Sequence, residues 1–181
     1  MHRSLEAVFN RMQNDLQSLY EELNGQPDSV LNKKANPEEW SILQIMHHLI
    51  RAEDLALQYC QKKMSFNPEF NKAGVMTSLR GIAVTAYLAS PFKYKAPELV
   101  SEEYLPETST FWEVIKLWNT NRDELKQFLE TLPEDLLNKE VYKHPVGGRT
   151  TVRTMLKFHE GHFNRHRKQI RRALEEHKYV V

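Results

Sequence analysis

The chain has 181 residues, enough for one domain with a sizeable core and too few for two ordinary domains, so we expect a single domain over residues 1–181. Its hydrophobic content of 40 % and charged content of 27 % are typical of a soluble globular protein. The 25 Lys and Arg residues balance 24 acidic residues, which gives a net charge of +1. No global positive field attracts phosphates, so nucleic acid is a poor candidate for a partner.

The single cysteine, Cys60, excludes a disulfide within the chain, as in proteins of a reducing compartment. The N-terminal residues 1–6 contain none of the apolar core of a signal peptide. No apolar run approaches the roughly 18 residues needed to span a bilayer. We therefore expect a cytoplasmic protein with no membrane partner.

Two early segments show apolar residues at steps of three and four, the period of an amphipathic helix. The first covers residues 4–23 and ends at an Asn-Gly pair that favours a helix C-terminus. The second begins after Ser41, a predicted N-cap, and runs to about residue 63. Residues 26–39 between them are predicted to be a connector with a turn.

The stretch from residue 65 to residue 108 is interrupted by several prolines and glycines. Val75–Ala89 is apolar with small residues and is compatible with a further helix. Phe92, Tyr94 and Tyr104, together with the prolines, suggest a long covering loop, and such loops in compact domains often carry function. We expect this stretch to form a lid or wall over one end of the helices.

The second half of the chain contains two more helical patterns. One covers residues 111–131 after a cap at Ser109 or Thr110, and the last begins at residue 152 and continues to about residue 174. Residues 139–149 resemble an extended segment or hairpin that leads into the last helix. Four long helices with one long crossover between the second and the third describe a four-helix bundle.

Three histidines of the last predicted helix lie close to one stripe. His162 and His166 are four residues apart, and His159 is three before His162, so their side chains share roughly one face. Two imidazoles at the four-residue spacing can reach one metal ion, as in the HExxH helix. A third ligand must then come from elsewhere, and the pair His47 and His48 on the second helix is the obvious donor.

Ordinary structural roles would also explain these histidines. Basic residues flank His166, so the last helix could simply present a solvated basic face: Arg165, Arg167, Lys168, Arg171 and Arg172. His48 lies at the edge of an apolar stripe, where it could face a cleft between helices or donate a hydrogen bond to a backbone carbonyl. The second histidine cluster on a second amphipathic helix favours the metal site.

Residues 40–49 resemble the start of the second helix in the DinB/YfiT-like family. In that family a Trp-Ser opening, here Trp40 and Ser41, is followed by a metal-binding histidine just before a leucine, here His48 and Leu49. The resemblance implies an all-α, DinB/YfiT-like four-helix bundle with a long crossover between helices 2 and 3.

The last helix carries a second motif of the same family, two histidines four apart followed by Gln-Ile. Here these are His162, His166 and the pair at residues 169–170. The resemblance therefore implies His48, His162 and His166 as the ligands of a divalent metal ion, and it leaves His47 and His159 outside the pattern. Three imidazoles plus water leave an open position, as in catalytic zinc sites. We expect zinc, with nickel, iron or manganese as alternatives.

Two acidic residues follow His48 on the second predicted helix, Glu53 and Asp54. Either could hold a ligand imidazole in place or act as a general base, and these are our candidate catalytic residues. The alternative is that both are solvated acids on an exposed face.

The family includes transferases that join a low-molecular-weight thiol, such as bacillithiol or mycothiol, to an electrophile, and isomerases that use the same thiols. It also includes proteins described as metal-dependent hydrolases and many members without a known reaction. The resemblance thus implies a metal-dependent thiol S-transferase acting on a small-molecule substrate. The alternatives are a metal-dependent hydrolase and a non-catalytic, dimeric DinB-like binding protein.

Several bulky residues suggest that the protein pairs with itself. Phe111, Trp112 and Trp118 cannot all face one core if they lie on a single helix. Burying them against a second copy would explain them, so we expect a homodimer.

Overall fold

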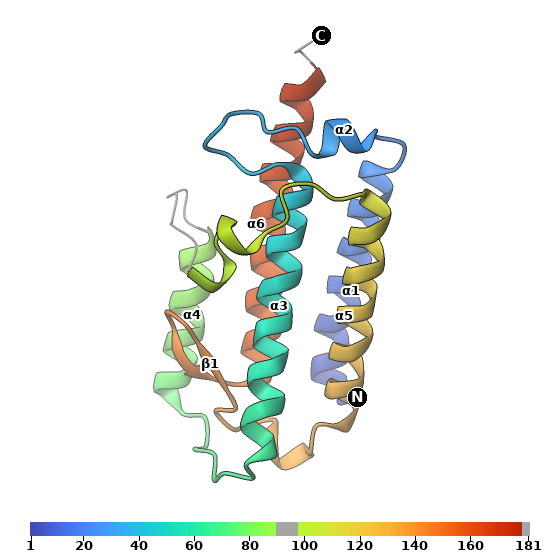
Figure 1. Ribbon diagram of the computed structural model, residues 1–181. Coiled ribbons are helices and arrows are strands. Elements are labelled where there is room, and N and C mark those ends of the chain that lie inside the picture. Colours follow the sequence, from blue (N-terminus) through green and yellow to red (C-terminus); the bar gives the residue numbers. More distant parts are fainter. Residues whose placement is uncertain (90–97, 179–181) are drawn as a thin grey trace.

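Helices form most of the structure, a computed structural model that describes residues 1–89 and 98–178 (Figure 1). The long helices are α1 (Arg3–Leu23), α3 (Ile42–Ser65), α5 (Phe111–Thr131) and α6 (Val152–Lys178). α3 packs against α5 and α6, and α1 packs against α6 and α5, so the four helices form the predicted bundle. None of the helices in the described ranges is long and apolar enough to cross a membrane.

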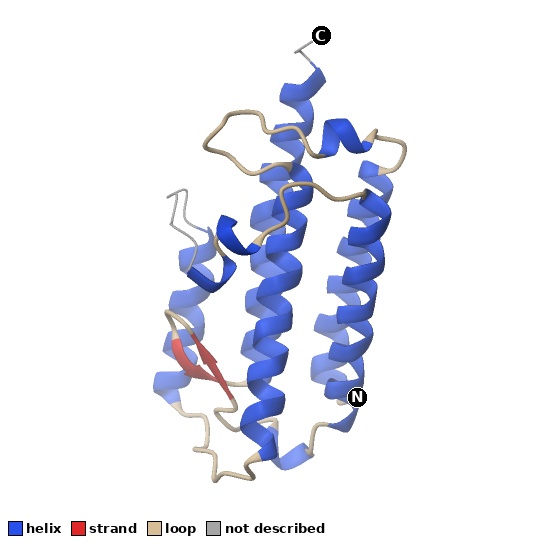
Figure 2. Ribbon diagram, viewed as in Figure 1, coloured by secondary structure: helices blue, strands red, loops and turns tan. Residues whose placement is uncertain are grey.

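The shorter elements connect these helices along the chain, and Figure 2 shows them at the ends and along one side of the bundle. They are α2 (Asp28–Leu31), α4 (Val75–Ala89), the 3₁₀ helices η1 (Glu98–Val100), η2 (Glu102–Tyr104) and η3 (Glu134–Leu136), and the strands β1 (Tyr142–His144) and β2 (Gly148–Thr150). In Figure 1, α1 and α6 run from the bottom of the bundle to the top, whereas α3 and α5 run downwards. Because α3 and α5 are parallel, their connection must return along the bundle, which is the predicted crossover.

Capping boxes fix the starts of α3 and α5. The Ser41 hydroxyl accepts from the backbone N–H of Gln44, and the Gln44 side chain accepts from the backbone N–H of Ser41. Thr110 and Glu113 make the same reciprocal pair at the start of α5. The predicted cap at Ser41 is confirmed.

The core consists of two apolar clusters stacked along the bundle. The upper cluster surrounds Trp118 and the lower one surrounds Phe128. α3 contributes to both clusters, and its apolar residues in each lie at helical spacing: Ile42, Leu43, Ile45, Met46, Leu49 and Ile50 in the upper cluster, and Ala56, Leu57 and Cys60 in the lower. Burial of these apolar side chains is the main term that stabilises the bundle.

Polar side chains occupy the level between the two clusters. On α3, Glu53 lies between the residues of the upper cluster and those of the lower one. Asn121 and Arg122 have the same position on α5, and His159 has it on α6. All four are at most 6 % exposed. Gln13 of α1 joins this group at its edge by accepting a hydrogen bond from Arg122 Nη1 at 3.0 Å. We call these five residues the buried polar layer.

The crossover between α3 and α5 contains the helix α4, so it is more than a covering loop. α4 is the helix with which the apolar run Val75–Ala89 was compatible, and it packs against α6 and β2. Tyr104 of η2 lies against α3, with the guanidinium carbon of Arg51 4.7 Å from its ring centroid. Phe92 and Tyr94, which we also assigned to a covering segment, lie outside the described residues.

The predicted hairpin precedes α6. β1 and β2 are antiparallel, with Tyr142 opposite Thr150. Gly148 has a φ of +75°, a conformation that favours glycine. A Cβ on Gly147 would lie 2.2 Å from Cγ2 of Val84, so only glycine allows the turn to approach α4 this closely.

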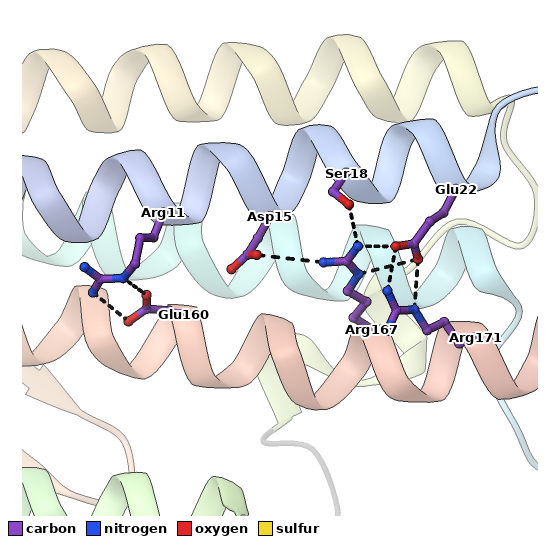
Figure 3. Close-up of polar contacts among 7 residues, drawn as sticks. All are labelled: Arg11, Asp15, Ser18, Glu22, Glu160, Arg167 and Arg171. Carbon is purple, nitrogen blue, oxygen red and sulfur yellow. Dashed lines mark hydrogen bonds and ion pairs between the residues drawn. The ribbon is translucent and has the colours of Figure 1, made fainter.

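Ion pairs join α1 and α6 along one side of the bundle (Figure 3). Arg11 pairs with Glu160 at 2.6 Å, and Arg167 and Arg171 both contact Glu22. Hydrogen bonds from Arg171 and Arg167 lower the pKa of Glu22 to about 2. Two basic residues that we considered part of a solvated face therefore bind acids of α1.

Candidate metal centre

Three imidazoles from two helices meet at one point in the bundle. His48 extends from α3, and His162 and His166 extend from successive turns of the antiparallel α6. His162 Nε2 lies 3.2 Å from His48 Nε2 and 3.1 Å from His166 Nε2. The ligand atoms of all three lie within 4.8 Å of one another. The structure thus brings together the three histidines that the resemblance singled out.

The outer nitrogens of two rings fix where their lone pairs point. His48 Nδ1 donates to the backbone carbonyl of Val100 at 2.9 Å, because a carbonyl can only accept. His166 Nδ1 contacts Oε1 of Gln169 at 3.0 Å, again an acceptor. In their neutral forms both rings therefore carry the proton on Nδ1 and direct an unprotonated Nε2 toward His162.

This arrangement fits a metal ion better than it fits mutual hydrogen bonding. His162 Nε2 can donate a proton to only one of its two neighbours, so one lone pair always lacks a partner within the trio. Zinc–imidazole bonds of 2.0–2.1 Å in a tetrahedral site separate the nitrogens by about 3.3 Å. The distances of 3.1 and 3.2 Å from His162 lie close to that value, and all three ligand atoms lie within 4.8 Å of one another.

The protonation of the three rings also suits a metal site. Burial is the main cause that lowers the pKa of His48, of His162 and of His166, the last to about 3. The neighbouring rings of the trio lower the pKa of His162 and of His166 further. All three are neutral at pH 7, the form in which imidazole binds metals.

Aromatic rings form part of the surroundings of the site. The Trp40 ring lies 4.8 Å from that of His48, and the Phe158 ring stacks on His162 at 5.4 Å and 19°. His48 is only 3 % exposed, whereas His162 and His166 are half-buried. The trio is therefore less completely covered on its α6 side than on its α3 side.

The two histidines outside the family pattern have other surroundings. His47 Nε2 contacts the Ser109 hydroxyl at 3.0 Å, away from the trio. His159 is 2 % exposed and lies in the buried polar layer one turn before His162. Its pKa falls to about 3, because of burial and then the nearby charge of Arg122.

The candidate acid Glu53 is buried in an ion pair. Its two oxygens accept from Arg122 at 2.7 and 2.8 Å, and Trp118 Nε1 donates to it at 3.3 Å. Among the described residues its hydrogen bonds go to α5 and to no histidine. A role as general base for hydrolysis gains no support from this geometry.

The other candidate acid, Asp54, lies on the outer side of α3. Gln58, one turn later, donates to both of its oxygens at 2.9 and 2.8 Å. This contact is a local one on the helix surface. The catalytic role assigned to Asp54 stays a prediction.

The sequence analysis did not predict the groups that bind the outer nitrogens of His48 and His166. The carbonyl of Val100 is a backbone atom of η1, and no residue type signals its role. Gln169 belongs to the Gln-Ile part of the last-helix motif, and its spacing of three from His166 could have identified it.

Comparison with known proteins places this site in a family. The sequence profile of the DinB superfamily matches residues 8–170, which include all three histidines. No curated protein and no solved structure gives a significant match. The match covers most of the chain, and the helical bundle agrees with it. The chain therefore belongs to the DinB superfamily, with a three-histidine group at its centre that could hold a metal ion.

Proposed function

We propose that the protein binds a divalent metal ion, zinc in the first place, through His48, His162 and His166. The observation that carries this proposal is the convergence of three neutral Nε2 atoms, two of them oriented by outer hydrogen bonds. Nickel, iron and manganese also accept imidazole ligands and are the alternatives. No more than three protein ligands are proposed, which leaves a position for a substrate.

We further propose that the bound ion serves a thiol S-transferase reaction. A divalent ion lowers the pKa of a thiol and so supplies a nucleophile at neutral pH. The chain would contribute three neutral ligands, their orientation by Val100 and Gln169, and the aromatic surroundings of Trp40 and Phe158. The partly exposed His162 and His166 leave access for a small thiol and its electrophile.

Metal-loaded protein should transfer small thiols to an electrophile such as monochlorobimane. We expect a metal-dependent rate with the wild type and loss of that rate in His48→Ala. The matched control is His47→Ala, which removes the adjacent imidazole that contacts Ser109 and spares the trio. Equal rates for the wild type and His48→Ala would contradict the transferase proposal.

We also propose that the protein is a homodimer, on a narrower basis than the sequence suggested. Trp118 is fully buried, so it is not available to a partner, and Phe111 is partly buried against the same core. Trp112 is 72 % exposed, and Leu117 on the same helix is 47 % exposed. Light scattering should give twice the chain mass, and Trp112→Lys should lower it. A monomeric wild type would exclude the dimer.

A further inference from the structure

One ligand of the trio differs from the other two in its outer nitrogen. His48 Nδ1 and His166 Nδ1 have partners in Val100 and Gln169. His162 Nδ1 is buried and has no hydrogen-bond partner among the residues that the structure describes. Ligating histidines almost always donate from the second nitrogen, which fixes the ring and its tautomer. We therefore expect a hydrogen-bond acceptor next to His162 Nδ1.

A second set of buried ring nitrogens without partners lies one turn away. Both Nδ1 and Nε2 of His159 are buried and make no hydrogen bond within the described part of the chain. Residues three apart on a helix are surface neighbours, so His159 and His162 share one face of α6. The Phe158 ring contacts both imidazoles, at 5.2 and 5.4 Å between centroids. A charge on His159 would also lower the pKa of His162, as expected of close groups.

The polar layer explains why His159 should stay neutral. Arg122 is bound to Glu53 and Gln13, and its charge opposes a second cation on His159. A neutral imidazole has one donor and one acceptor nitrogen. His159 can therefore accept a hydrogen bond at its unprotonated nitrogen while it stays neutral.

We propose that His159 is a positioning residue for the metal ligand His162, acting through one buried water. The water accepts from His162 Nδ1–H and donates to the unprotonated nitrogen of His159. This holds His162 in the tautomer whose Nε2 lone pair faces His48 and His166. Buried waters typically join polar groups of this kind with about three hydrogen bonds. The inference rests on the proposed metal site.

Zinc affinity, measured by competition with a chromophoric chelator, tests this role. His159→Phe keeps a ring in the layer and removes both nitrogens, and we expect it to weaken zinc binding about 10–100-fold. His159→Gln restores a donor and an acceptor, so its affinity should lie much closer to that of the wild type. The matched control is His47→Phe, which should bind zinc as the wild type does.

A second measurement needs no variant and detects the tautomer itself. In the zinc-loaded wild type, imidazole ¹H–¹⁵N NMR should show a proton on His162 Nδ1 that exchanges slowly with solvent. A rapidly exchanging proton, or wild-type affinity in His159→Phe, would overturn the role of His159 while leaving the metal site in place. A wild type that binds no zinc would instead overturn the metal site and this inference together.

Discussion

The protonation of single histidines determines when a metal can bind. A surface imidazole with a pKa near 6.5 is lost as a ligand below that pH. Burial lowers the pKa of His48. Burial together with the neighbouring rings lowers the pKa of His162 and holds that of His166 near 3. Protons therefore compete with the metal only at much lower pH.

We expect bound zinc to be retained on acidification from pH 7 to about pH 5, in contrast to a surface histidine pair that releases it near pH 6.5. Equilibrium dialysis at fixed free zinc, followed by metal analysis, measures this retention. Zinc released in one step near pH 6.5 would show that the three rings are not held in the buried, neutral arrangement.

The buried ion pair between Glu53 and Arg122 joins α3 to α5. Each side chain is at most 2 % exposed, and the two form paired hydrogen bonds at 2.7 and 2.8 Å. Removing one partner leaves an uncompensated charge in the core, whereas replacing both with apolar residues does not. The loss of one partner should therefore cost more stability than the replacement of both.

Arg122→Met should lower the free energy of unfolding by about 3–5 kcal/mol, because Glu53 is left buried alone. The double variant with Glu53→Met should regain most of that loss and keep the metal site. Urea unfolding of the metal-free variants measures both values. A double variant as unstable as the single one would argue against the buried-charge explanation.

The close approach of the hairpin turn to α4 gives a second prediction at the level of elements. Gly147→Ala places a Cβ 2.2 Å from Val84, so the turn or α4 must move, and we expect a loss of about 1–3 kcal/mol. Gly74→Ala is the matched control, since no atom lies within 4 Å of its Cβ. Equal thermal midpoints for the two variants would contradict the packing of α4 on the hairpin.

Periodicity predicted the four long helices, because each carries an apolar stripe at helical spacing that the bundle buries. The motif at residues 40–49 and the two histidines of α6 predicted the three histidines that the structure brings together. The polar layer was not predicted, since nothing local shows that Glu53 meets Arg122 across the bundle. The complete burial of Trp118 was not predicted, because periodicity does not reveal how much of the surface of α5 the helices α1, α3 and α6 cover together.

The whole molecule keeps several histidines uncharged in its interior, and this sets its response to acid. Burial lowers the pKa of His144 to about 4 and that of His159 to about 3. An unfolded chain binds these protons near pH 6.5, so the folded state binds fewer protons between pH 6.5 and pH 3. Their contribution to folding is therefore largest above pH 6.5 and is lost as the pH falls.

Metal-free protein should lose stability below pH 6.5, at about 1.4 kcal/mol per pH unit for each histidine kept neutral. Urea midpoints between pH 8 and pH 5 measure this slope, and His144→Phe should reduce it. The low pKa of Glu22 adds stability that is complete above about pH 4.5 and is lost as the pH falls from there toward 2, so its loss follows that of the histidines. A midpoint that is constant from pH 7 to pH 5 would contradict this account of the buried histidines.

The most direct test is a count of metal per chain in purified protein after equilibration with zinc and removal of the excess. We expect one ion per chain in the wild type and in His47→Ala, and none in His162→Ala, because His162 Nε2 lies within 3.2 Å of both other ligand nitrogens. A wild type without bound metal, or a His162→Ala variant that keeps its ion, would contradict the three-histidine centre.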